Sequence, residues 1–297
     1  MARPDLRHPK NTDGDWFVDT RCIDCGTCRD IAPGLFCAVG NHSVVRRQPE
    51  TGSGGETTDA WLAAQACPTN SIGTLSRQRR PGRLYPREIE AGSGVFDLGY
   101  CSEDSFGASA WFVQRPGPGG GNLLIDSPRF TAAVVGPIGE MGGIAHILLT
   151  HQDDVADAGR FAERFGARVW IHEDDRRAAP FATDLLRSID EVPIAPGLVA
   201  VPVPGHTRGS VVYVLDDRFL FTGDSLAWSH ERRDLTAFRG ACWYSWTAQT
   251  RSLERLAASD HRFAWVLPGH GARAQADPDD FHRRLEGLVR RMGQPAG

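Results

Sequence analysis

The chain has 297 residues, of which 41% are hydrophobic and 24% are charged, and its net charge is −4. This composition excludes collagen, coiled coils and wholesale disorder, and the mildly acidic balance makes the chain a poor candidate for binding duplex nucleic acid. No apolar run approaches the ~20 residues that a membrane span needs, and the N-terminus lacks the apolar segment of a secretory signal, so we expect a cytoplasmic protein with no membrane partner.

The first predicted domain, residues 11–76, is rich in loops and cysteine. Its short apolar pieces are Trp16–Val18 and Val44–Val45, and a helix is predicted over Thr58–Ala66 after a flexible loop at 48–56. Five of the seven cysteines lie at or before residue 67. An odd number of cysteines without a secretory signal argues against a disulfide framework, and their crowding predicts a local site.

Residues 77–91 are predicted to form a basic linker exposed to solvent. From residue 92 to residue 297, short apolar runs alternate with helical ones, which predicts a layered α/β domain. A hairpin tip is expected at Pro116–Gly121. The predicted strands are Asn122–Asp126, Ile144–Thr150, Arg168–Ile171, Leu198–Val203, Ser210–Val214, Phe219–Thr222 and Ala264–Leu267. The predicted helices are Val155–Phe165, Ala248–Ala258 and Pro278–Met292.

The cysteine spacing is the sharpest signal in the first domain. Cys22, Cys25 and Cys28 form a C-x2-C-x2-C run, and Cys67 follows much later, directly before a proline. Three thiolates on one tight loop and a fourth supplied by the fold are how a protein holds a cubane iron–sulfur cluster. From about Phe17 through Gly73 the sequence resembles the bacterial ferredoxin family.

The departures from that family concern its second cluster. Ala32 stands where the fourth cysteine of the first run would be, and Thr57, Ala60 and Ala63 stand at the other positions of the second set. The resemblance therefore implies one [4Fe-4S] cluster, with the ligands Cys22, Cys25, Cys28 and Cys67. The alternative is a zinc ion on the same four thiolates, although cysteine followed by proline is not typical of a zinc ribbon.

Polar residues follow four apolar strands of the larger domain. They occur in Thr150-His151-Gln152-Asp153-Asp154, Pro204-Gly205-His206, Thr222-Gly223-Asp224 and Leu267-Pro268-Gly269-His270. Loops at strand ends that bring histidine and aspartate together build metal sites. An earlier strand ends at Asp126, which is expected to organise the site loop. Over about residues 92–275 this order resembles the metallo-β-lactamase superfamily, which implies an αββα sandwich with the site at one edge.

The first of these motifs departs from the family pattern H-x-H-x-D-H. His151 keeps the first position, Asp153 replaces the second histidine, and Val155 and Ala156 replace two ligands of a second metal ion. The resemblance implies one metal ion, iron or zinc, and a second site that is lost because two remaining ligands bind a divalent ion poorly. The predicted ligands are His151, Asp153, His206, Asp224 and His270.

Two classes of function follow. In the first, the protein is an enzyme with a small-molecule substrate. As zinc, the metal would activate water against an ester or thioester, with Asp153 or Asp154 as general base. As iron on a 2-His-1-carboxylate set, it would bind oxygen or a sulfur substrate, with electrons passing through the ferredoxin-like domain from a redox partner protein. Trp228, Trp243, Tyr244 and Trp246 are expected either to wall the pocket or to pack on the sandwich.

The second class is a non-catalytic redox sensor or electron-transfer protein. Its metallo-β-lactamase scaffold would be degenerate, and its polar groups would hydrogen-bond one another. The loss of the ligands at positions 155 and 156 favours this interpretation, whereas the retained motifs around His206 and Asp224 favour an enzyme.

Overall fold

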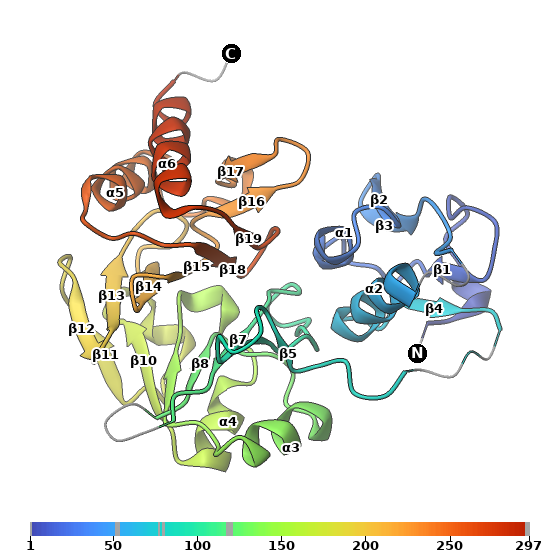
Figure 1. The fold of residues 1–297 in the computed structure, drawn as a ribbon, viewed down its shortest axis with the longest axis horizontal. Coiled ribbons are helices and arrows are strands. Elements are labelled where there is room, and N and C mark those ends of the chain that lie inside the picture. The colour runs from blue at the N-terminus through green and yellow to red at the C-terminus, as the bar shows by residue number, and fades with distance from the viewer. Residues whose placement is uncertain (1, 51–53, 77, 79–80, 117–120, 295–297) are drawn as a thin grey trace.

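The computed structural model of the chain describes residues 2–50, 54–76, 78, 81–116 and 121–294. Figure 1 shows a small N-terminal domain beside a larger one. Most of the predicted hairpin tip at Pro116–Gly121 lies outside the described residues, as does part of the predicted loop at 48–56. No helix in the described part of the chain has both the length and the apolar character needed to cross a membrane.

Within the described residues, the small domain contains two pairs of strands and two α-helices. Strand β1 (Trp16–Val18) pairs with β4 (Ile72–Thr74), and β2 (Phe36–Val39) pairs with β3 (His42–Val45), both antiparallel. Helix α1 spans Thr27–Ile31. Helix α2 spans Gly54–Ala66, so it begins earlier than the predicted Thr58. The preceding residues also belong to this domain, because the backbone N–H of Arg3 donates to the Asp19 carboxylate at 2.8 Å.

Two sheets form the larger domain. In spatial order, the first contains β11 (Asp184–Leu186), β10 (Arg168–His172), β9 (His146–Leu148), β8 (Leu123–Ile125), β7 (Trp111–Val113), β6 (Val95–Asp97) and β5 (Arg87–Glu88). The second contains β12 (Val192–Ala195), β13 (Leu198–Pro202), β14 (Val211–Leu215), β15 (Phe219–Gly223), β18 (Trp265–Pro268) and β19 (Ala274–Gln275). A small extra pair is formed by β16 (Ala227–Ser229) and β17 (Asp234–Thr236). Strand β5 lies within the stretch predicted as linker, so the sheet begins before residue 92.

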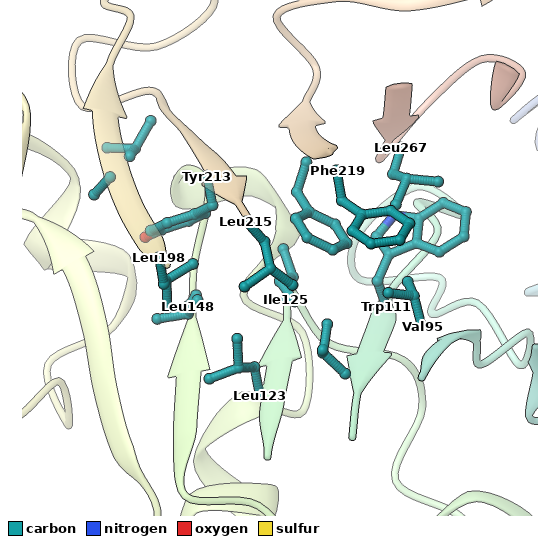
Figure 2. Packing of buried hydrophobic residues seen from close by; sticks show 14 of the residues in the cluster. Val95, Trp111, Leu123, Ile125, Leu148, Leu198, Tyr213, Leu215, Phe219 and Leu267 are labelled. Atoms are coloured by element: carbon teal, nitrogen blue, oxygen red, sulfur yellow. The ribbon is translucent and has the colours of Figure 1, made fainter. Parts of the chain in front are cut away.

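The two sheets pack face to face and are covered by helices on their outer faces. Leu123, Ile125, Leu148, Tyr213 and Leu267 meet between the sheets (Figure 2). Helices α3 (Ala132–Glu140) and α4 (Ala158–Phe165) cover the first sheet. Helices α5 (Trp246–Ala258) and α6 (Pro278–Met292) cover the second. This is the predicted αββα sandwich.

The alternation of side chains along β8 explains this layering. Leu123 and Ile125 point into the core between the sheets, whereas Leu124 points to the helix-covered face. Successive side chains of a strand point to opposite faces. Since both faces are covered, the strand is apolar throughout. Each such fully buried leucine or isoleucine contributes about 1.5–3 kcal/mol to folding.

Helix α2 connects the two domains. Its residues Leu62 and Ala66 share a buried apolar cluster with Tyr85 and Cys101. The backbone N–H of Cys101 donates to the carbonyl of Ala66 at 3.1 Å, and the hydroxyl of Tyr85 donates to the carbonyl of Leu62 at 3.4 Å. These contacts hold the cysteine-rich end of the small domain against the larger domain.

Candidate cluster pocket and metal centre

The four cysteines predicted as cluster ligands line one small cavity, together with Ser43, Thr69 and apolar side chains. Cys22 and Cys25 lie on the loop before α1, Cys28 lies in α1, and Cys67 directly follows α2. Gly26 adopts φ +88° at the start of α1, a left-handed conformation that lets the chain turn between Cys25 and Cys28.

Backbone N–H groups point at the sulfur atoms of this cavity. Those of Asp24 and Ser43 donate to Cys22 Sγ at 3.4 and 3.3 Å, and that of Ser71 donates to Cys67 Sγ at 3.3 Å. Such donors stabilise cluster-bound thiolates and tune their potential. Burial raises the pKa of Cys25 to about 11, so a thiolate there needs a neighbouring cation. The donor set fits an iron–sulfur cluster.

Three of the predicted metal ligands in the larger domain converge. The ligand atoms of His151, His206 and Asp224 lie within 4.8 Å of one another, and all three residues are buried. Asp224 Oδ2 is 3.8 Å from His151 Nε2 and 3.7 Å from His206 Nε2. Asp153 faces the same point, with Oδ2 at 3.2 Å from His206 Nε2. His151 Nε2 is buried without a hydrogen-bond partner among the described residues, which fits a bound cation.

Asp126 and Thr150 orient the first histidine. Asp126 accepts hydrogen bonds from the backbone N–H and the hydroxyl of Thr150, both at 2.8 Å, and the hydroxyl lies 2.9 Å from His151 Nδ1. A polar partner on one ring nitrogen leaves the other for the metal. Burial lowers the pKa of His151 to about 4, so the ring remains neutral, the form that binds a metal ion.

A second set of ligand atoms lies beside the first and corrects one prediction. Asp154 joins Asp224 and His270 within 4.8 Å, so the second site is not reduced to two residues. Both carboxylate oxygens of Asp154 are buried without a hydrogen-bond partner among the described residues. Burial raises the pKa of this carboxyl well above its usual range. The 3-10 turn at Gln152–Asp154 directs the Asp154 side chain inward. Gly269 leaves room for this carboxylate, because a Cβ on residue 269 would lie 2.6 Å from Asp154 Oδ2.

His270 is held at both ring nitrogens. Its Nε2 lies 3.2 Å from the carbonyl oxygen of Phe106, and its Nδ1 lies 2.9 Å from both oxygens of Asp224. Burial alone would lower the pKa of His270, but the charge of Asp224 raises it to about 10. Nothing in the sequence pointed to Phe106, because it contributes a backbone carbonyl and carries no motif.

A groove of about 1220 Å³ opens in front of these residues. The larger domain contributes Asp153, His206 and Trp243 to its wall, and the small domain contributes Cys25 and Arg29. The Trp243 side chain is 68% exposed, and its ring centroid is 6.3 Å from that of His206. The groove is therefore shared between the two domains.

The four aromatic residues predicted near the site divide into two groups. Trp228 and Trp243 line the groove. Tyr244 instead lies under the guanidinium of Arg208, and Trp246 donates its indole N–H to the carbonyl of Met292.

Known proteins are similar to both parts of the chain. Residues 18–74 match the family model described as the 4Fe-4S single cluster domain of ferredoxin I. The hydroxyacylglutathione hydrolase of Fuscovulum blasticum is 34% identical over 131 residues, which cover 42% of this chain and 49% of that protein. The hydroxyacylglutathione hydrolase of Acidiphilium cryptum is 32% identical over 121 residues, 39% of this chain and 48% of that protein. The chain thus spans about half the length of the curated relatives it matches.

The fold has counterparts among solved structures. The crystal structure of the DIM-1 metallo-β-lactamase exposed to ceftazidime superposes with a TM-score of 0.52 at 19% identity, and the match covers 69% of this chain and 96% of that one. The chain therefore joins a single-cluster ferredoxin domain to a domain with the metallo-β-lactamase fold.

Proposed function

We propose that the protein is a redox metalloenzyme that acts on a small molecule in the groove between its domains. His151, His206 and Asp224 hold one metal ion, and a [4Fe-4S] cluster on the four cysteines supplies its electrons. One observation carries this proposal: Cys25, a cluster ligand, lines the same groove as His206 and Asp224. A cluster beside the substrate groove is placed for electron transfer to the metal centre.

The groove residues have distinct roles in this reaction. As iron, the metal ion would supply an open position for substrate and one-electron chemistry. The hydrogen bond with His206 lowers the pKa of Asp153, so this half-buried carboxylate is ionised and can accept a proton from substrate. Trp243 and Phe106, 68% and 53% exposed, present apolar surface to the substrate, Trp243 beside His206 and Phe106 beside His270.

The second candidate is hydrolysis of an ester or thioester. It is favoured by the similarity to hydroxyacylglutathione hydrolases and by the second ligand set of Asp154, Asp224 and His270. A zinc ion would lower the pKa of bound water toward ~7. Asp153 would be the general base, since its side chain is 42% exposed whereas Asp154 is only 1% exposed.

Metal analysis separates the two enzymes. The protein is purified without oxygen, and iron, zinc and acid-labile sulfide are measured per chain in the wild type, in His206→Ala and in the control His146→Ala. His146 is a suitable control because it accepts a hydrogen bond from the Trp170 indole on β10, outside the site. We expect about four iron and four sulfide from one cluster, and one further iron that only His206→Ala lacks.

Other outcomes decide against the redox proposal. Zinc as the metal lost in His206→Ala would favour the hydrolase. If His206→Ala retained every metal of the wild type, neither enzyme would be supported, and the non-catalytic electron-transfer protein would remain.

A further inference from the structure

We propose that Thr27 and the Phe106–Gly107 segment form the route by which an electron passes from the cluster to the metal centre. This inference rests on the proposed redox function and names the residues that carry it out. Thr27 belongs to the small domain, and Phe106–Gly107 lies on the loop before β7 of the larger one.

At the cluster end, the backbone of the larger domain touches a cluster ligand. A Cβ on Gly107 would lie 2.7 Å from Cys25 Cβ and 2.8 Å from Cys25 Sγ, and Gly107 has φ +87°, so glycine is required there. The buried hydroxyl of Thr27 lies 3.3 Å from Cys25 Sγ and donates to the carbonyl of Gly107 at 2.8 Å. The sulfur is thus linked to the larger domain by one hydroxyl.

At the metal end, the same loop touches His270. The carbonyl of Phe106, which belongs to the peptide bond preceding Gly107, lies 3.2 Å from His270 Nε2. The opposite ring nitrogen is 2.9 Å from the Asp224 carboxylate. The backbone N–H of Ser109 donates to the carbonyl of Gly269 at 2.7 Å and so ties the loop to the segment that carries His270.

The other cluster sulfurs have different surroundings. Cys22 accepts hydrogen bonds from Asp24 and Ser43, and Cys67 accepts one from Ser71, all within the small domain. Cys28 has its side-chain hydrogen bond with Ser43, also in the small domain. Among the sulfur contacts described for these residues, the connection to the metal ligands therefore runs through Cys25. Because the single hydroxyl proton of Thr27 is donated to Gly107, the first step from the cluster-bound sulfur of Cys25 is a contact at 3.3 Å. Hydrogen bonds and covalent bonds make up the remainder of the route to Asp224.

The transfer balances as a one-electron step. With a reduced cluster on the four cysteines and a ferric ion on His151, His206 and Asp224, one electron would leave the cluster and reduce the ferric ion to ferrous, and no proton would have to cross between the domains. A one-electron donor protein then reduces the cluster again.

The rate of this step can be measured without substrate. The full-length protein with its cluster and a ferric ion at the metal centre is reduced by a flash-generated one-electron donor, and the reoxidation of the cluster is followed by its visible absorption. We expect a first-order phase that is independent of protein concentration in the wild type and absent when zinc occupies the metal centre. Thr27→Val should slow this phase several-fold, and Thr27→Ser, which retains the hydroxyl, should restore it.

Thr69→Val is the matched control. Thr69 Oγ1 lies 3.6 Å from Cys67 Sγ, so this change also removes a hydroxyl beside a cluster sulfur, but one that does not lead to the metal centre. Cluster content and reduction potential are measured in every variant, and Thr27→Ala replaces Thr27→Val if valine prevents cluster assembly. Equal rates in Thr27→Val and Thr69→Val would refute the route and leave the proposed function standing. The absence of the intramolecular phase in iron-loaded wild type would refute both.

Discussion

Asp126 determines which nitrogen of His151 faces the metal centre. The carboxylate is buried and accepts both hydrogen bonds of Thr150, whose hydroxyl contacts His151 Nδ1. It lies outside both sets of converging ligand atoms, so its role is to position a ligand. This agrees with the expectation from the sequence that Asp126 organises the site loop.

Asp126→Asn should therefore weaken metal binding by about 10–100-fold, the usual cost of losing a group that orients a ligand. The amide replaces one carboxylate oxygen by an NH2 donor, so the Thr150 hydroxyl loses one of its two acceptors and the negative charge behind it, and the His151 ring is held less firmly. Competition against a chelating dye measures the dissociation constant. The control is Asp157→Asn, a carboxylate that accepts the Phe130 backbone N–H at 2.7 Å and does not reach the metal centre. Equal affinities in the two variants would contradict the role of Asp126.

The site residues differ in how well a sequence reveals them. The cysteines, His151, His206 and Asp224 could be predicted because each lies in a short motif that carries a resemblance to a known family. Asp154 was predicted as a catalytic base, yet its place depends on a 3-10 turn and on the positive φ of Ala156, which no pattern of residue types encodes. Phe106 could not be found because a backbone carbonyl has no residue signature.

Element boundaries show the same contrast. Helix α6 occupies the predicted range Pro278–Met292, because an Asp277 cap and a proline at its first turn mark the start. Helix α4 begins at Ala158, three residues after the predicted start, because Gln152–Asp154 is a separate turn. Helix α3 was missed because Gly136 and Pro137 are poor helix formers, and packing of Val134 and Ile138 on the sheet overrides that propensity.

Helix α2 is the element that holds the two domains together. Leu62 is 1% exposed and packs against Tyr85 and Cys101 of the larger domain. Leu62→Ala should cost about 2–5 kcal/mol, the range for a buried leucine that leaves a cavity. Because Leu62 lies in the small domain, which carries the predicted cluster ligands, heating should bleach the cluster of this variant at a lower temperature than that of the wild type.

Leu285→Ala is the matched control for this element. Leu285 is also 1% exposed, but it lies in α6 and packs only within the larger domain. We expect Leu285→Ala to lower the unfolding midpoint of the sandwich, read from circular dichroism, and to leave cluster bleaching near its wild-type temperature. Identical shifts of both signals in both variants would show that the domains unfold as one unit.

At the scale of the whole molecule, each domain has its own main core, and the two domains share the small apolar cluster around Leu62 and one groove. The core of the small domain includes Cys28 and Cys67 themselves, whereas the sandwich buries its own residues between two sheets and beneath four helices. The groove, by contrast, needs both domains, because the metal residues form one side and the cluster loop forms the other. Folding of the sandwich should thus be independent of the cluster, whereas the supply of electrons to the metal centre should depend on it.

Cys67→Ser tests this division of labour. Since the fourth cluster ligand is part of the small-domain core, its loss should abolish the cluster and unfold the small domain, whereas the sandwich should keep its circular dichroism and its metal ion. Iron, sulfide and the bound metal are measured per chain. The control Cys242→Ser changes a cysteine of the sandwich whose thiol donates to the Gly205 carbonyl at 3.1 Å, and it should retain the cluster. A Cys67→Ser protein with a full cluster would overturn the assignment of this ligand, and one with an unfolded sandwich would overturn the independence of the two cores.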